Sequence, residues 1–246
     1  MKRHDHKILG FTFFNRSYDE LIKQINQEIQ HRNNCIIITP TTEILGEAMQ
    51  DKYLSKILSV ATLLLPDSVS LIWVARLLGK SCSKRVTGID TLYKLGKNKR
   101  KTYKVFYLGA KADVLEKAVN VSKEIFPSFD IVGSHHGYFQ DSEKKAVIKE
   151  INSSKADIVF VGLGFPKQEQ FIYENRKDIH VPIKITVGGT FDVISGVLKR
   201  APVWMQKSAL EWAFRLLQEP ARITRMSLIP VYLFRILYRE ITAKHK

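Results

Sequence analysis

Asp67 is the residue of this sequence best suited to acid–base chemistry. It directly follows the apolar run Leu63–Pro66, where a buried strand would end, and open parallel sheets bind ligands outside the carboxyl ends of their strands. A carboxylate at that point could take a proton from a hydroxyl group. Thr39 ends another apolar run and could hydrogen-bond a substrate at the same edge. Local alternatives are a helix N-cap for Asp67 and a turn residue before Pro40 for Thr39.

Two glycine-rich turns carry a second group of candidate residues. Each follows a β-branched run, and glycine pairs in such turns permit sharp bends and close approach of a ligand to the backbone. We expect the two turns to converge on one rim as a substrate-binding site formed by Gly164, Lys167, Gln168, Glu169, Gly188, Gly189, Thr190 and Asp192. Taken singly, each turn is equally typical of a tight strand-to-helix connection.

Arginine suits the binding of phosphate because its planar guanidinium group forms paired hydrogen bonds with phosphate oxygens. On a continuous helix, Arg215, Arg222 and Arg225 would share one face, although Pro220 is expected to bend that helix. Arg85 is a further candidate near the crevice. The sequence has no Asp-x-Asp segment, so we expect no metal and no cofactor, with phosphate charge met by side chains or helix N-termini. A basic helix face resting on lipid phosphates is the alternative role for the three C-terminal arginines.

The elements that position these residues follow from the alternation of apolar patterns. Helical spacing alternates with short β-branched runs, which favours an α/β fold with a mostly parallel, Rossmann-like sheet and helices on both faces. Strands are predicted at 35–39, 63–65, 105–108, 129–133, 157–162 and 183–188, and helices at 18–32, 42–51, 70–78, 113–126, 142–152 and 168–175. After Ala201 only helices are expected. This predicts an α/β catalytic domain over 1–200 and a C-terminal helical appendage over 201–246.

Positive charge is concentrated in two parts of the chain. Residues 76–111 contain 11 Lys or Arg against one acidic residue, and residues 201–246 contain eight against three. No nucleic-acid-binding motif accompanies this charge, so nucleic acid is not an expected partner. The run SLIPVYLFRILY at 227–238 is too short to span a bilayer but suits an anionic membrane surface. A core-packed helix, or a contact in a homo-oligomer, is the alternative for this run.

The N-terminal segment is basic and has no apolar core of the kind found in secretory signals. No apolar run reaches the length of a membrane-spanning helix. We therefore expect a cytoplasmic protein that is peripheral at the inner face of the cell membrane.

Several blocks of the sequence resemble the WecG/TagA/CpsF glycosyltransferase family. They are GLGFPKQE at 162–169, VGGTFDVISG at 187–196, KRAP at 199–202 and EWAFRLLQEPARITR at 211–225, with TPTTE, LLLPDSVS, KRVTGID and HHGYF upstream. The resemblance implies an inverting transferase that moves N-acetylmannosamine, or a related N-acetylhexosamine, from UDP to a polyprenyl-diphosphate-linked N-acetylglucosamine. Such enzymes serve cell-surface polymer synthesis, of teichoic acid or exopolysaccharide. It also implies that Asp67 is the base, that Arg215, Arg222 and Arg225 complete the donor site, and that residues 1–200 bind the nucleotide sugar.

Three positions depart from the family pattern. Thr41, a candidate substrate-binding residue, stands where Asn is usual, and Ser68 and Ser70 replace glycines. These changes motivate one alternative, a non-catalytic UDP-sugar-binding or scaffold protein of polymer assembly. A dinucleotide-dependent oxidoreductase is disfavoured, because the turn at 162–167 lacks the third glycine of the G-x-G-x-x-G motif.

Overall fold

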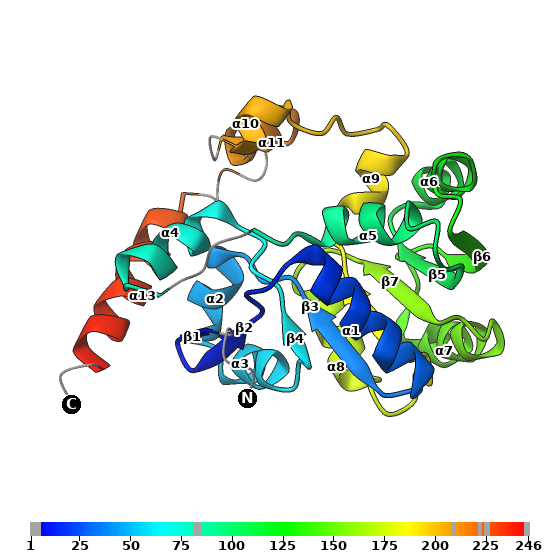
Figure 1. The fold of residues 1–246 in the computed structure, drawn as a ribbon, viewed down its shortest axis with the longest axis horizontal. Helices are drawn as coiled ribbons and strands as arrows, with labels where there is room; N and C mark the ends of the chain where they lie inside the picture. The colour runs from blue at the N-terminus through cyan, green and yellow to red at the C-terminus, as the bar shows by residue number, and fades with distance from the viewer. Residues whose placement is uncertain (1–5, 81–84, 208–209, 221–222, 224–226, 244–246) are drawn as a thin grey trace.

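The described residues contribute eight strands to one sheet that runs through the middle of the protein (Figure 1). The computed structural model describes residues 6–80, 85–207, 210–220, 223 and 227–243. In sheet order the strands are β1 His6–Ile8, β2 Phe11–Phe13, β4 Leu63–Leu64, β3 Cys35–Ile38, β8 Ile183–Thr186, β7 Ile158–Gly162, β5 Tyr103–Gly109 and β6 Phe129–His135. The hairpin of β1 and β2 is antiparallel and the other strand pairs are parallel. The predicted α/β fold with a mostly parallel sheet is confirmed.

Helices cover both faces of this sheet. One face carries α2 Thr42–Ala48, α3 Lys52–Ser59, α4 Val69–Leu77, α7 Lys144–Ser153, α8 Lys167–Glu174 and α13 Ile229–Ala243, and a 3₁₀ turn, η1 Asp141–Glu143, precedes α7. The other face carries α1 Tyr18–Gln30, α5 Gly88–Gly96, α6 Ala112–Ile125 and α9 Thr190–Ile194. Two short helices, α10 Val203–Lys207 and α11 Glu211–Gln218, stand apart from both layers at the top of Figure 1.

The sequence patterns explain the regular elements. The central strand β7 is buried at every position, as a β-branched strand covered on both faces should be. Helix α1 begins at a capping box between Ser17 and Glu20, and its buried residues Leu21, Ile25 and Ile29 recur every four positions. Local signals of this kind made most strands and helices predictable.

The connections at the centre of the sheet place a crevice at its carboxyl edge. Strands β3 and β8 are neighbours, and the chain leaves β3 into α2 on one face but leaves β8 into α9 on the other. Where successive connections diverge in this way, the ends of the strands are left open to a ligand. The candidate residues after β3, β4, β7 and β8 all lie along this edge.

Helix α13 is docked against the helices α2 and α4. Ile236 on α13 is 0% exposed and belongs to the core. Tyr232 lies against Gly46 of α2, where an added Cβ would stand 2.1 Å from the tyrosine Cγ. Glu240 accepts hydrogen bonds from the Leu9 amide and the Lys80 ammonium group. The membrane-surface role of this helix, and the division into a domain and an appendage, stay predictions.

Candidate active site

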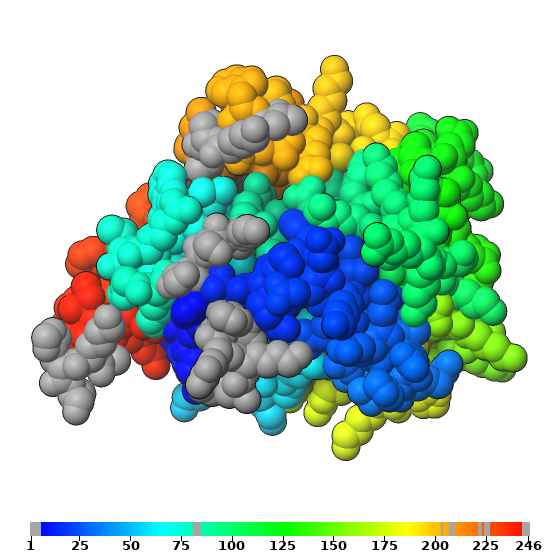
Figure 2. Space-filling view, in the orientation of Figure 1, coloured from blue at the N-terminus to red at the C-terminus, as the bar shows by residue number. Residues whose placement is uncertain are grey.

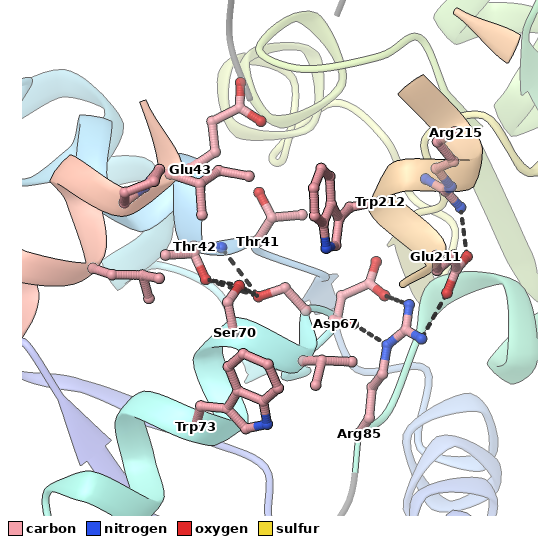
Figure 3. Close-up of a pocket in the computed structure, with 15 residues that line it drawn as sticks. Thr41, Thr42, Glu43, Asp67, Ser70, Trp73, Arg85, Glu211, Trp212 and Arg215 are labelled. Carbon is pink, nitrogen blue, oxygen red and sulfur yellow. Dashed lines mark hydrogen bonds and ion pairs between the residues drawn. The ribbon is translucent and has the colours of Figure 1, made fainter. Parts of the chain in front are cut away.

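A pocket of about 360 Å³ lies between the ends of β3 and β4 and the helices α11 and α13 (Figure 3). Its polar lining comprises Thr41, Thr42, Glu43, Asp67, Ser68, Ser70, Arg85, Glu211 and Arg215, and its apolar lining comprises Val69, Trp73, Trp212, Ile229, Pro230 and Leu233. Of the residues proposed from the sequence, the structure therefore brings together Thr41, Asp67, Arg85 and Arg215. Arg222 and Arg225 lie outside the described residues.

Asp67 is free to act in the pocket because another residue caps the helix that follows it. Ser68 is the N-cap of α4, and its hydroxyl accepts a hydrogen bond of 3.3 Å from the Leu71 amide. The capping alternative for Asp67 is therefore wrong. The aspartate side chain remains 27% exposed, so a substrate hydroxyl could reach it.

Burial raises the pKa of Asp67 from its ordinary range to about 6. Arg85 and Arg215 oppose this rise in the pKa, whereas the neighbouring acids Glu211 and Asp90 add to it. A carboxyl group with a pKa near 6 is ionised at neutral pH yet more basic than an ordinary aspartate. This matches what general base catalysis asks of a proton acceptor.

Two arginines surround the carboxylates of the pocket. The Nη1 of Arg85 lies 2.7 Å from Oε2 of Glu211, and its Nη2 lies 3.7 Å from Oδ1 of Asp67. Its Nε also donates to the backbone carbonyl of Asp67. Arg215, on α11, places Nη2 3.3 Å from the other oxygen of Glu211. Glu211 was missed from the sequence, although its spacing of four residues from Arg215 is a usual sign of a helical ion pair.

A cluster of hydroxyl groups joins the N-termini of α2 and α4. Thr42 Oγ1 lies 2.9 Å from Ser68 Oγ and 2.7 Å from Ser70 Oγ, and the Thr42 amide donates to Ser68 Oγ at 3.2 Å. Thr41 caps α2 by accepting from the Ile44 amide at 3.4 Å. The three departures from the family pattern thus have structural partners, and they line the pocket with groups that can donate or accept.

The two glycine-rich turns, residues 162–169 and 187–192, meet as expected, and we call them the glycine rim. The Gly188 amide donates to the side-chain oxygen of Gln168 at 3.0 Å, and the Gln168 amide group donates to Glu169 at 2.8 Å. Gly164 and Gly188 have φ angles of +76° and +53°, in the left-handed region that favours glycine. The rim is therefore a backbone frame in which a side-chain hydrogen bond joins the two turns.

The candidate residues of the glycine rim do not line the pocket. Gln168, Glu169 and Thr190 are buried, and the Thr190 hydroxyl donates to the Val187 carbonyl at 2.5 Å. Lys167 is exposed at the start of α8. Asp192 lies in the first turn of α9, where a Cβ added at Gly189 would stand 3.3 Å from its carboxylate.

Thr39 joins the two parts of the edge. It is buried, its amide donates to Thr186 Oγ1 at 3.0 Å, and its hydroxyl donates to the Thr186 carbonyl at 3.2 Å. The structure thus places this hydroxyl between β3 and β8 and not among the residues that line the pocket. The alternative role of Thr39, as a turn residue before Pro40, does not account for these hydrogen bonds with Thr186.

The described parts of the chain contain no group of three or more His, Cys, Asp or Glu side chains arranged to hold a metal ion. Within the same parts, every helix is too short or too polar to cross a membrane. Both findings concern the described ranges alone.

Group transfer with an anionic leaving group needs a proton acceptor and a cationic surround. The fold and the pocket offer both at one edge of the sheet, and they define the chain as an α/β transferase. Comparison with known families is more specific. The chain belongs to the glycosyl transferase WecG/TagA/CpsF family, whose model matches residues 6–246, so the resemblance inferred from the sequence blocks is confirmed.

Similar proteins cover most of this chain. A protein of Bacillus spizizenii (strain ATCC 23059 / NRRL B-14472 / W23) is 37% identical over 213 residues, which span 86% of this chain and 82% of the relative. One of Bacillus subtilis (strain 168) is 36% identical, covering 88% and 84%. One of Staphylococcus aureus (strain MW2) is 31% identical, covering 93% and 91%. Each is named N-acetylglucosaminyldiphosphoundecaprenol N-acetyl-beta-D-mannosaminyltransferase.

Proposed function

We propose that this protein transfers N-acetylmannosamine, or a related N-acetylhexosamine, from UDP to a polyprenyl-diphosphate-linked N-acetylglucosamine. The observation that carries the proposal is the carboxylate of Asp67, whose pKa is raised to about 6 beside Arg85 in the pocket. The names of the relatives supply the sugar and the lipid-linked acceptor. The product would enter the synthesis of a cell-surface polymer.

The transfer proceeds with inversion at the anomeric carbon. Asp67 accepts the proton of the acceptor hydroxyl while that oxygen forms a bond to the anomeric carbon of the donor sugar. The bond from the anomeric carbon to the β-phosphate oxygen breaks on the opposite side, and UDP departs with the electron pair. Arg85 and Arg215 stabilise the charge that develops on the diphosphate, since arginine pairs with phosphate bidentately. Arg222 and Arg225 are proposed to join them.

We assign the nucleotide of the donor and the lipid of the acceptor to different parts of the carboxyl edge, with the donor diphosphate beside Arg85 and Arg215. The glycine rim offers half-buried backbone at Gly164 and Gly188, with open space where a side chain would stand, to the nucleotide of the donor. The apolar lining of the pocket, with Trp73, Pro230 and Leu233, suits the first isoprene units of the acceptor. Thr41 and the hydroxyl cluster are placed to hydrogen-bond the sugar between them.

The exposed apolar side chains of α4 and α13 support a proposal that the enzyme works at the inner face of the membrane. Leu77 on α4 and Phe234 on α13 are 72% and 70% exposed, and the two helices are in contact, at the left of Figure 2. Trp73 and Tyr238 on the same helices are also exposed. Aromatic and aliphatic side chains beside basic residues bind the interface of an anionic bilayer. Binding to anionic vesicles that weakens in Phe234→Ala and Leu77→Ala would support this surface, and unchanged binding would contradict it.

A turnover assay with a panel of UDP-sugars and a short-chain lipid-diphosphate N-acetylglucosamine acceptor tests the proposed reaction. We expect UDP release with UDP-N-acetylmannosamine and loss of that release in Asp67→Asn. UDP binding without turnover of any sugar in the panel would instead support the non-catalytic alternative.

A further inference from the structure

Glu211 is a buried acid in the lining of the pocket, and the reaction described so far gives it no role. It is the first residue of α11 and only 6% exposed, whereas Trp212 beside it and Leu217 farther along α11 are largely exposed. The residue thus turns its carboxylate inward and is the one fully buried position of a helix whose other described residues are half-buried or exposed. Figure 3 shows this carboxylate facing the guanidinium group of Arg85 on one side and that of Arg215 on the other.

Both oxygens of Glu211 are engaged by arginine. Oε2 lies 2.7 Å from Arg85 Nη1, and Oε1 lies 3.3 Å from Arg215 Nη2. Arg85 comes from the segment before α5 and Arg215 from α11, so the carboxylate bridges two elements far apart in the sequence. A single anion that bridges two guanidinium groups is also how a diphosphate would be held between them.

The charges immediately around the two arginines balance in this arrangement. Two acids, Asp67 and Glu211, face Arg85 and Arg215, and a third acid, Glu43, also lines the pocket. An incoming diphosphate therefore meets arginines that are already paired, and it adds negative charge beside two carboxylates. The diphosphate can form its full set of hydrogen bonds with the arginines only if one carboxylate moves away from its arginine partner.

We propose that Glu211 is a positioning residue that holds Arg85 and Arg215 in place until a diphosphate displaces its carboxylate from at least one of them. The carboxylate keeps both side chains turned into the pocket and keeps α11 against the sheet edge before substrate arrives. This inference rests on the proposed function for the identity of the ligand, because it assumes that a diphosphate enters this pocket.

Replacement of the competing charge should strengthen the binding of a diphosphate. Glu211→Gln keeps the size of the side chain and one acceptor oxygen but removes the negative charge. We expect inorganic pyrophosphate to bind about tenfold more tightly to this variant. A guanidinium group that no longer pairs with a carboxylate can form about one more charged hydrogen bond with the phosphate. If Glu211 had only a structural role, the variant would bind pyrophosphate as tightly as the parent or more weakly.

Calorimetric titration with three probes carries the test, and Glu219→Gln is the matched control. The control removes the same charge just after α11, away from the pocket lining, and should bind like the parent. UDP and farnesyl diphosphate distinguish the source of the diphosphate, since tighter binding of one alone identifies the donor or the lipid-linked acceptor. Unchanged or weaker binding of all three probes to Glu211→Gln would overturn the proposal.

A second variant guards against a folding defect in Glu211→Gln. Glu211→Asp keeps the charge but shortens the reach, so it should release one arginine and tighten pyrophosphate binding by a smaller factor, about two- to threefold. If Glu211→Gln does not fold, unchanged or weaker binding to Glu211→Asp overturns the proposal instead. These binding measurements do not depend on turnover, so failure of the transfer reaction would remain distinguishable from failure of this inference.

The pH profile of turnover supplies a readout that a structural role would not move. The groups that face the Asp67 carboxyl are Arg85, Arg215, Glu211, Asp90 and the Tyr18 phenol. Glu211 raises the pKa of Asp67, so Glu211→Gln should shift the acid limb of the profile to lower pH. An unshifted limb would show that Glu211 does not act on this charge.

Discussion

The residues that line the pocket come from segments far apart in the chain. The glycine rim is instead formed by two turns that are separated in the chain only by helix α8 and strand β8. The two turns of the rim are joined to each other, because Gln168 accepts from the Gly188 amide and donates to Glu169. The pocket instead holds charges that face a cavity, and the pKa of Asp67 is raised there. Backbone geometry thus forms the frame for a ligand, while the ionised groups that do chemistry are gathered from elsewhere.

Asp67→Asn should have the largest effect, because it should impair turnover in the pocket while it leaves UDP binding at the glycine rim unchanged. The amide keeps the shape of the carboxyl group but cannot accept the proton, so kcat should fall about 10²–10⁴-fold. The affinity for UDP should stay within about twofold, because the 3.7 Å pair of Asp67 with Arg85 competes only weakly with a phosphate and the variant leaves the glycine rim intact. Steady-state kinetics and calorimetry check both, and retained turnover would remove Asp67 from the role of base.

The pH dependence of turnover should follow the Asp67 carboxyl. Its pKa is raised to about 6, so kcat/KM should fall about tenfold for each pH unit below that value as the base becomes protonated. The same rise means that the folded state favours the neutral acid, and the stability this contributes is lost as pH rises through about 6. Asp67→Asn should therefore melt no lower than the parent at pH 8. A flat kcat/KM profile between pH 5 and pH 7 would contradict the assignment.

Gln168→Ala should damage the glycine rim and spare the pocket. It removes the acceptor of the Gly188 amide and one donor to Glu169, which costs about 1–3 kcal/mol in a buried setting. The melting temperature should fall by about 5 °C and UDP should bind more weakly. Gln170→Ala, on the same helix, is the control. A drop in kcat at saturating UDP-sugar, with unchanged UDP affinity, would mean that the rim takes part in chemistry.

Gly46→Ala should disturb the pocket wall and spare the rim. The added Cβ would overlap the ring of Tyr232, next to the pocket residue Leu233. Overpacking of this kind costs about 1–3 kcal/mol. Transfer to the lipid-linked acceptor should weaken while UDP affinity stays the same. In a Tyr232→Ala background the cost should vanish, and additive losses in that cycle would show that the contact is not the cause.

The smallest effect is expected from chelation. If arginines and helix N-termini meet the charge of the leaving diphosphate, excess EDTA should change turnover by less than about twofold. Added Mg²⁺ or Mn²⁺ should have an equally small effect. Loss of activity with EDTA, and its return with either ion, would overturn metal independence.

The sequence predicted the parts of the fold that carry local signals. The β-branched runs became strands β3, β5, β7 and β8, and the apolar spacing of Leu21 and Ile25 became α1. It did not predict the hairpin β1–β2, whose strands are three residues each, or α5, which begins and ends at glycine. Short strands and glycine-bounded helices depend on packing that a local pattern does not contain.

The site was predictable to a similar extent. Asp67 could be placed because it follows a strand-like run, and the two glycine turns because each follows another. The bridge from Glu211 to Arg85 could not, since four of the eight described strands lie between the two residues in the chain. The bond from Thr39 to Thr186 was missed for the same reason, because neighbours in a sheet need not be neighbours in the sequence.

The close contact between Gly46 on α2 and the Tyr232 ring on α13 has a consequence for how the protein folds during its synthesis. Helix α2 leaves the ribosome before five of the eight described strands, and α13 follows only after β8 has been synthesised. Domains begin to fold while the chain is still emerging, and contacts between distant segments form late. A nascent chain can therefore assemble its glycine rim while the apolar wall of its pocket is still missing, so an unfinished molecule would have no complete place for a lipid.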